Sequence, residues 1–283
     1  MYINTTSKES MQCSICNYLN VSPSQLHRLF SSAAKKAQAS SYINGDIFNG
    51  ELDSFVYDHM PSFPIDEISF FHLSRRLNNC IDDYNGNNLM DLLTTVNPLS
   101  QFLKEHQVKF QRENNHLVLI HRGKIKPLNE TYDSDVLYLR GRLGYNVNRE
   151  DFCFNGFAFK DLLYKNDYAR QLYFAPEFIG ILSQYLHSPS ICNDYLEQSS
   201  YYCYEYLIPM DKIIFDDFQT TSQSRKSVYL INRVLNRLSD YDSYHIDYIY
   251  DHDNPIIRLG DFDTMDEKYF ISKELISQNM IFC

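Results

Sequence analysis

Tryptophan is absent from this sequence, and so are the glycine motifs on which many nucleotide-binding and hydrolytic enzymes depend. The chain has no Trp but 23 Tyr and 19 Phe, so these two residue types must supply the aromatic packing of the core. It contains no Walker or kinase glycine loop, no Gly-x-Gly-x-x-Gly and no Gly-x-Ser-x-Gly elbow. The sequence therefore argues against P-loop enzymes, kinases and serine hydrolases of the elbow type.

Long apolar runs are also missing. No stretch of about 18 consecutive apolar residues occurs. The segment from Met1 to Thr5 has neither the basic opening nor the apolar core of a cleaved secretory signal. We therefore expect a soluble protein with no membrane partner and no Sec-type signal.

The seven cysteines do not have the spacing of a disulfide framework. They lie at positions 13, 16, 80, 153, 192, 203 and 283, an odd and scattered set that favours reduced thiols in a cytosol. Cys13 and Cys16 have the spacing of half a zinc site, but only His27 is near, and tetrahedral zinc takes four ligands. The metal-like side chains from His245 to Asp253 are expected to be solvated, so we predict no metal.

The chain is acidic, with 26 Lys and Arg, 36 Asp and Glu, and a net charge of −10. Affinity for phosphate backbones comes mainly from basic side chains that displace counterions, so a general nucleic-acid binder is disfavoured. Local basic segments, each expected to be a solvated face, are Lys35-Lys36, Arg75-Arg76, Arg122 to Lys126 and Arg225-Lys226.

A helical N-terminal extension is expected over residues 1–60, where Ser22-Pro23 opens a helix. Pro61 and Pro64 break that pattern, so residues 61–283 are expected to form the main domain. We predict strands at 68–73, 108–112, 117–121, 136–140 and 172–175, and helices at 89–96, 98–106, 178–185 and 228–238.

Glu205 stands alone in the aromatic and aliphatic run Tyr204-Glu205-Tyr206-Leu207-Ile208-Pro209. The run predicts a strand with Cys203 and Glu205 on one face and the tyrosines on the other. A charged side chain in such a run is either exposed on an edge strand, or it is paired with another group or has a functional role. Both alternatives remain open at this point.

Three motifs in order resemble the core of the arginine-type ADP-ribosyltransferases, a family that includes cholera-like, pertussis-like and actin-modifying toxins. They are Leu137-Tyr138-Leu139-Arg140-Gly141, Leu172-Tyr173-Phe174-Ala175-Pro176 and the Glu205 run, so the resemblance covers about residues 135–215. It implies an α+β fold with a split β-sheet and inserted helices, and NAD as the substrate.

The resemblance also implies roles for individual residues. Arg140 would hold the dinucleotide with its planar fork of donors, and Glu205 would orient a ribose hydroxyl and stabilise developing positive charge. Tyr173 or Phe174 would stack on the nicotinamide, unless they are plain core aromatics. Tyr173-Phe174-Ala175 replaces the Ser-Thr-Ser of the family, so the hydroxyl that positions the glutamate is missing. Cys203 replaces the second acid of arginine-modifying relatives, which leaves the acceptor open.

A second register resembles diphtheria toxin and the poly(ADP-ribose) polymerases. In it, His72 and Ser74 would grip the ribose and amide of the nicotinamide nucleoside, Tyr173 would stack, and Glu267 would be catalytic. Leu73 stands where that group has glycine. The other interpretation of His72 is a hydrogen-bonded core histidine.

The resemblance implies a mono-ADP-ribosyltransferase toxin or secreted effector, delivered into a target cell and acting in its cytosol. Its acceptor would be a macromolecule, protein rather than nucleic acid, and an activating host factor, a chaperone or an antitoxin would be a further partner. The alternative is a non-catalytic interaction protein or an antitoxin-like partner, in which the Tyr-rich segment from Tyr195 to Tyr206 forms an interface.

Overall fold

A computed structural model describes residues 1–39, 42–80, 82–129, 132–146 and 150–282 of the chain. These residues form a mixed α+β structure with 47% helix and 21% strand, and the strand pairing is mostly antiparallel. The predicted α+β class is therefore confirmed. Each helix in the described part of the chain is too short or too polar to cross a membrane.

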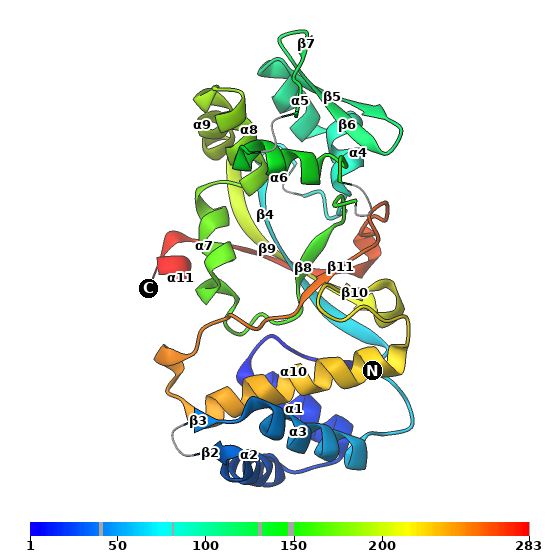
Figure 1. Cartoon of the computed structure of the whole chain (residues 1–283), viewed down its shortest axis with the longest axis vertical. Coiled ribbons are helices and arrows are strands. Elements are labelled where there is room, and N and C mark those ends of the chain that lie inside the picture. The colour runs from blue at the N-terminus through cyan, green and yellow to red at the C-terminus, as the bar shows by residue number, and fades with distance from the viewer. Residues whose placement is uncertain (40–41, 81, 130–131, 147–149, 283) are drawn as a thin grey trace. The chain divides into compact units, whose positions relative to one another are not determined.

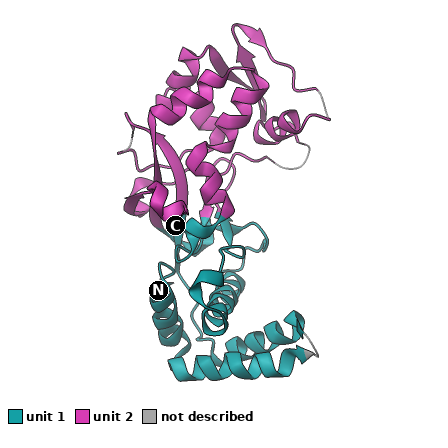
Figure 2. Ribbon diagram, turned by 90° about the vertical axis from the view of Figure 1, so that its left-hand side faces the viewer, with its two compact units in different colours: residues 1–71, 157–166, 207–257 teal, residues 72–156, 167–206, 258–283 magenta. Residues whose placement is uncertain are grey.

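The chain folds into two compact units, each built from three separate segments (Figure 2). Unit 1 comprises residues 1–71, 157–166 and 207–257, and unit 2 comprises residues 72–156, 167–206 and 258–283. This division differs from the boundary expected near residue 60. The N-terminal helices pack on a helix of residues 223–243, so they are part of a larger unit.

The described part of unit 1 contains four α-helices, which are labelled in Figure 1. Each begins at a capping residue. Ser7 and Ser22 form capping boxes, while Asn44 and Ser222 accept hydrogen bonds from backbone N–H groups of the first turn. The helices are α1 (Lys8–Leu19), α2 (Pro23–Ala37), α3 (Gly45–His59) and α10 (Gln223–Ser243). Thus α2 begins where Ser22-Pro23 predicted.

The larger sheet has the strand order β10-β11-β8-β4-β9-β12, with β1 beside β4. Four of its strands, β4, β8, β9 and β11, contribute residues to both units. Phe71 lies opposite Phe157 in an antiparallel pair, whereas β1 runs parallel to β4. The strands are β1 (Tyr2–Ile3), β4 (Glu67–Leu77), β8 (Asn155–Phe157), β9 (Ser199–Pro209), β10 (Ile214–Phe215), β11 (Ile256–Arg258) and β12 (Phe270–Leu275), and a separate pair is β2 (Gln38–Ala39) and β3 (Tyr42–Ile43).

Unit 2 combines helices with a three-stranded antiparallel meander around one apolar core. Leu103, Leu117, Leu139, Leu182 and Ile191 are each at most 1% exposed in that core. The helices are α4 (Leu89–Thr94), α5 (Pro98–Glu105), α6 (Ser134–Arg142), α7 (Asp167–Phe174), α8 (Glu177–Tyr185), α9 (Pro189–Glu197) and α11 (Gln278–Phe282), and the meander is β5 (Val108–Glu113), β6 (His116–His121) and β7 (Lys124–Ile125).

Two predicted strands are wrong. Residues 136–140 lie in helix α6, because Asp133 caps its first turn and Val136 and Leu139, three residues apart, both face the core. Residues 172–174 end helix α7, in which Ala169 and Leu172 are buried with the same spacing. The predicted hairpin of β5 and β6, the strands at β4 and β9 and the helices α4, α5, α8 and α10 are confirmed within a few residues.

Candidate functional site

Glu205 lies in the middle of β9 and faces Ser272 of the neighbouring strand. The two strands are antiparallel, and their register shifts between Phe270, opposite Tyr206, and Ser272, opposite Glu205. Ile271 is the extra residue of this bulge, which sets the Ser272 side chain beside the carboxylate. Ser272 Oγ donates a hydrogen bond to Glu205 Oε2 at 2.8 Å. A half-buried carboxylate is thus held in place by a hydroxyl from the next strand.

The strand that carries Glu205 is central and not an edge strand, since it lies between β4 and β12. On the side opposite to Glu205, Tyr204 and Tyr206 are completely buried. Arg76 stacks on the Tyr204 ring at 5.1 Å from its centroid, and the Tyr206 hydroxyl donates to a backbone carbonyl at 2.9 Å. The interpretation of Glu205 as an exposed edge-strand acid is therefore wrong.

The side of β9 that carries Glu205 also carries Tyr201 and Cys203, because side chains alternate along a strand. The Tyr201 hydroxyl donates to the carbonyl of Ala169 in α7 at 3.0 Å. The Tyr201 ring lies 6.3 Å from that of Tyr173, at an edge-to-face angle of 68°. Helix α7 therefore covers this side of β9 and brings Tyr173 to the same side as Glu205.

Tyr173 and Phe174 lie at the C-terminal end of α7, next to each other and to Phe282 of α11. The ring of Phe282 lies 5.6 Å from each of them. Arg75 donates to the Tyr173 carbonyl at 2.8 Å and so fixes the end of the helix. Tyr173 is half-buried in this cluster, whereas 61% of Phe174 is exposed. Of the two predicted stacking residues, only Tyr173 is held on the side of Glu205.

Arg140 lies in the last turn of α6 and not at the end of a strand. Its Nη1 donates to the carbonyl of Leu128, and its guanidinium lies 5.5 Å from the ring centroid of Tyr145. The partner of Glu205 is Ser272. Arg140 and Glu205, the two predicted catalytic residues, therefore have no interaction partner in common among the residues that the structure describes.

Arg142, which the sequence interpretation passed over, lies two residues later and on the other side of α6. Its Nη1 pairs with Asp151 Oδ2 at 2.9 Å, while its Nε is buried and has no partner in the described chain. One turn earlier, Tyr138 is hydrogen-bonded to Glu177 of α8, and burial raises the pKa of Tyr138. The Arg142 side chain is thus fixed by this cluster and is 20% exposed.

His72 lies on β4, where it is hydrogen-bonded and packed against an aromatic ring. Its Nδ1 is 2.7 Å from the carbonyl of Asn155, and its ring centroid lies 4.1 Å from that of Phe154 at a tilt of 32°. Burial, with Arg76 nearby, lowers the pKa of His72 to about 3. The ring is therefore neutral, and Nδ1 donates to the carbonyl. Glu267, which would be the catalytic carboxylate of the second register, is exposed at the start of a 3₁₀ turn. The second register therefore has no carboxylate that is held in place as Glu205 is.

The described residues include no group of three His, Cys, Asp or Glu side chains that could hold a metal ion. His27 pairs with Asp242 of α10 at 2.8 Å, and Cys13 and Cys16 carry free thiols. The half zinc site is therefore not completed by the histidine that the sequence offered.

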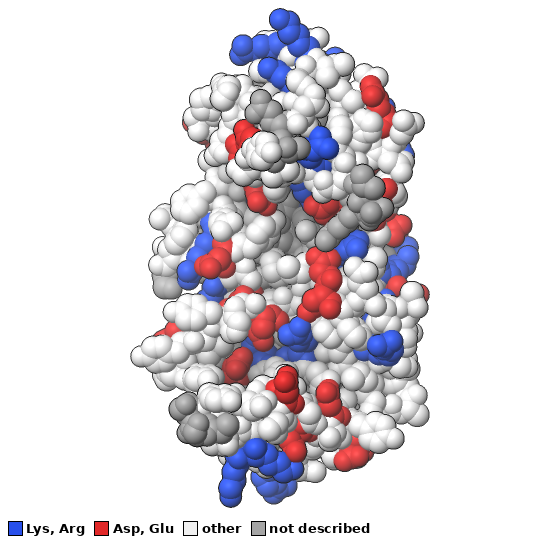
Figure 3. Space-filling view, in the orientation of Figure 1, with Lys and Arg blue, Asp and Glu red and all other residues white. Residues whose placement is uncertain are grey.

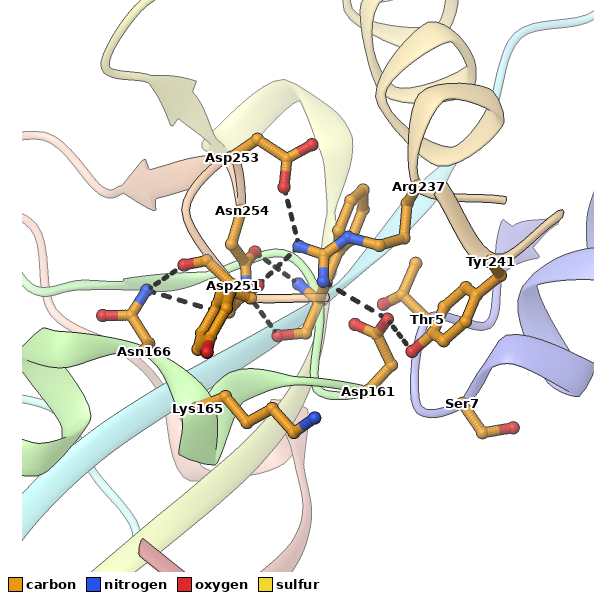
Figure 4. Close-up of polar contacts among 12 residues, drawn as sticks. Thr5, Ser7, Asp161, Lys165, Asn166, Arg237, Tyr241, Asp251, Asp253 and Asn254 are labelled. Carbon is orange, nitrogen blue, oxygen red and sulfur yellow. Dashed lines mark hydrogen bonds and ion pairs between the residues drawn. The ribbon is translucent and has the colours of Figure 1, made fainter. Parts of the chain in front are cut away.

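A group of buried charges surrounds Arg237 of α10 in unit 1 (Figure 4). The side chains of Arg237, Asp161 and Asp251 are at most 1% exposed. Arg237 Nη1 lies 3.5 Å from Asp161 Oδ2, and Nη2 donates both to Asp251 and, at 3.0 Å, to Asp253. These two late aspartates, expected in a solvated loop, are instead partners of an arginine.

Neutral groups extend this network across unit 1 (Figure 4). The Tyr241 hydroxyl donates to Asp161 Oδ2 at 2.8 Å, and the Asn254 side chain bonds both the N–H and the carbonyl of Phe159. Asp161 Oδ1 and Arg237 Nε are buried without a partner among the described residues. Burial raises the pKa of Asp161 to about 6, although Arg237 opposes the shift. Because it joins three chain segments and, among its charged side chains, only that of Asp253 is partly exposed, the network holds the unit together.

The side of β9 that carries Glu205 is therefore the better candidate for chemistry. It combines a held carboxylate and a fixed aromatic ring. Burial raises the pKa of Tyr168 in the covering helix α7 and Arg142 opposes the shift, so Arg142 of α6 lies near that helix. Comparisons of the sequence with known families and curated proteins, and of the structure with solved structures, found no match.

Proposed function

We propose that this protein is a mono-ADP-ribosyltransferase that moves ADP-ribose from NAD to a macromolecule, with Glu205 as its catalytic carboxylate. The observation that supports this is the hydrogen bond from Ser272 to Glu205. In the family that the sequence resembles, a hydroxyl positions the glutamate, and Tyr173-Phe174-Ala175 offers none. Ser272 supplies a hydroxyl from a different strand.

The chemistry requires a carboxylate held in this way. NAD loses nicotinamide through a state with developing positive charge on the ribose, and a carboxylate fixed beforehand stabilises that charge without reorganisation. Ser272 occupies Oε2 of Glu205, which leaves Oε1 for a ribose hydroxyl. Half-burial between strands strengthens both interactions relative to water.

The dinucleotide needs further contacts, for which we propose Tyr173 and Arg142. Tyr173 would stack on the nicotinamide, because α7 holds it on the same side of β9 as Glu205. Arg142, whose side chain is 20% exposed and fixed by Asp151, would donate from its guanidinium to a phosphate. We prefer Arg142 to Arg140, whose guanidinium is directed to Leu128 and Tyr145.

The rest of the proposal follows the resemblance. The larger sheet would be the split sheet of the family, and the protein would act as a toxin or effector in the cytosol of a target cell. The acceptor would be a protein. Cys203, in place of a second acid, argues against arginine as the modified side chain.

Transfer of label from NAD into a cell lysate tests this function, with and without nuclease to separate acceptors. Glu205→Gln should lose at least about a hundredfold in rate, because it removes the charge that stabilises the transition state. Ser272→Ala should lose about tenfold, the effect of one hydrogen bond. The exposed Glu197→Gln and the β9 variant Ser200→Ala are matched controls that should keep full activity.

Full labelling by Glu205→Gln would refute the proposed role. Loss of labelling in Glu267→Gln instead would favour the second register. The interaction-protein alternative is weakened in one respect, since Tyr195, Tyr201, Tyr204 and Tyr206 are at most 6% exposed and cannot form a surface. Thermal melting separates the two functions, because excess NAD should raise the melting temperature of an enzyme that binds it.

A further inference from the structure

The meander β5-β6-β7 of unit 2 carries a surplus of positive charge in an acidic protein. Residues 108–126 contain five Lys and Arg and one Glu, hence a net charge of +4, whereas the whole chain carries −10. Figure 3 shows Lys and Arg atoms gathered at the top of the view, where Figure 1 places β7. The basic side chains are Lys109, Arg112, Arg122, Lys124 and Lys126.

Most of these cations lack an acidic partner. Lys109, Arg122, Lys124 and Lys126 form no ion pair and no side-chain hydrogen bond with a described residue. Other lysines of the chain do have acidic partners, for instance Lys36 with Glu51 and Lys273 with an aspartate at 2.7 Å. A chain with ten more acids than bases leaves this group unneutralised, which is the pattern of a surface that meets a negative partner.

The backbone holds the group in a fixed arrangement. Arg122 and Gly123 both have positive φ, 53° and 74°, as the two central residues of a tight hairpin turn require. The turn places Lys124 opposite His121 and Ile125 opposite Ile120. Ile125 is 66% exposed and shares a face of the meander with Ile120 and Lys109, whereas Lys124 lies on the other face with His121.

The surroundings of His121 indicate the sign of the electrostatic potential at this end of the meander. It is 4% exposed, and neither ring nitrogen has a partner in the described part of the chain. Burial lowers the pKa of His121, and Arg122 and Lys126 lower it further. No described acid compensates these charges, so the end of the meander is positive and holds its histidine neutral.

We propose that the basic surface along the edge of the meander, with Lys109 and Ile125 on one face, Lys124 and Lys126 on the other and Arg122 in the turn, binds an extended acidic segment of a partner protein. Charge complementarity supplies the attraction, and the apolar Ile125 gives a place for an aliphatic side chain. The short edge strand β7 offers main-chain groups to which an extended peptide can pair. This inference is independent of the Glu205 site.

The charge of the remaining chain favours a short acidic segment over a polyanion. Outside the meander the protein carries −14, from the −10 of the chain and the +4 of residues 108–126. A nucleic acid or an anionic membrane extends over many times the Debye length of about 8 Å, and it would meet that negative surface as well. A peptide that covers only β7 would not.

Fluorescence anisotropy of a labelled peptide of alternating Glu and Val, titrated with the full-length protein, tests the surface. We expect binding that weakens with salt and falls at least about tenfold in Arg122→Glu/Lys124→Glu. Arg28→Glu/Lys35→Glu changes the net charge equally at exposed positions of α2, and it should bind as the unmodified protein does. Circular dichroism melts of both variants show that they are folded.

Two results would overturn the inference. The first is no binding of the peptide, or an equal loss in both double variants, which would show a general effect of charge. The second is tighter binding of single-stranded DNA or of phosphatidylserine vesicles that disappears only in Arg122→Glu/Lys124→Glu, which would assign the surface to a polyanion.

Discussion

Units 1 and 2 each contain an arginine that joins distant segments of the chain, but the two arginines bind different acceptors. Arg237 in unit 1 is surrounded by three carboxylates. Arg75 in unit 2 donates to the carbonyls of Tyr173, Leu196 and Ser199, at 2.8, 3.3 and 2.9 Å, and to the Ser199 hydroxyl at 3.0 Å. All the acceptors of Arg75 are neutral.

The difference shows two ways to compensate a cation that is withdrawn from solvent, completely at Arg237 and partly at Arg75. The Tyr173 and Leu196 carbonyls lie in the last turns of α7 and α9, where they have no partner within the helix and where the helix dipole is negative. Arg75 therefore caps two helices without a counter-ion. Three carboxylates surround one guanidinium at Arg237, and burial, with a smaller effect from Asp251, raises the pKa of Asp161. Of the two arginines, only Arg237 in unit 1 should make a contribution to stability that depends on pH.

Removal of the Arg237 side chain in unit 1 should have the largest effect on stability. Arg237→Met leaves Asp161, Asp251 and Asp253 without their cation, two of them completely buried, and should lower the free energy of unfolding by about 3–5 kcal/mol. Urea denaturation measures the loss. The control is Arg233→Met, one turn earlier in α10, whose partner Asp217 is 49% exposed; it should cost under about 1 kcal/mol. Equal losses in the two variants would mean that water reaches the carboxylates of the Arg237 group.

Removal of the Arg75 side chain in unit 2 should lower the free energy of unfolding by less, because it leaves no charged group without a partner. Arg75→Met leaves carbonyls of α7 and α9 unsatisfied, and we expect about 2–3 kcal/mol, unchanged between pH 5 and 8. Arg112→Met removes an exposed arginine that donates to the single carbonyl of Asn114, and it should have little effect. Because Arg75 fixes Tyr173, the variant should also lower NAD transfer. A loss of stability that changes with pH would break the comparison with Arg237.

Strong local signals in the sequence were enough for most elements of the fold. Ser22-Pro23 marks the start of α2, and alternation marks β9. The errors fall on short apolar runs, which fit a strand or a helix equally well. Leu137-Tyr138-Leu139 is such a run, and the deciding features were the cap at Asp133 and the burial of Val136 three residues before Leu139.

The candidate site was less predictable, because its contacts join distant residues. Glu205 stood out as a charge in an apolar run, but Ser272 is 67 residues later and reaches it only through a bulge, which no sequence period indicates. Arg142 could have been found from the helical spacing, since it follows the buried Leu139 by three residues. The acids around Arg237 lie between 14 and 76 residues from it, so only tertiary structure reveals them.

The smallest expected effect concerns the proton on Asp161, and it tests why Arg237 and Arg75 differ. Burial raises the pKa of Asp161 from 3.8 to about 6, so its contribution to stability is complete below pH 3.8 and is lost as the pH rises through 6. Between pH 5 and 7 this amounts to about 1 kcal/mol. Asp161→Asn stays neutral and should remove that slope from urea unfolding, whereas Asp167→Asn, at a residue whose side chain is 90% exposed, should keep it. An unchanged slope in Asp161→Asn would place the proton elsewhere, for example on Asp240, whose pKa burial also raises. The excess charge of unit 1 would then lie outside the Arg237 contacts, and the contrast with Arg75 would concern geometry alone.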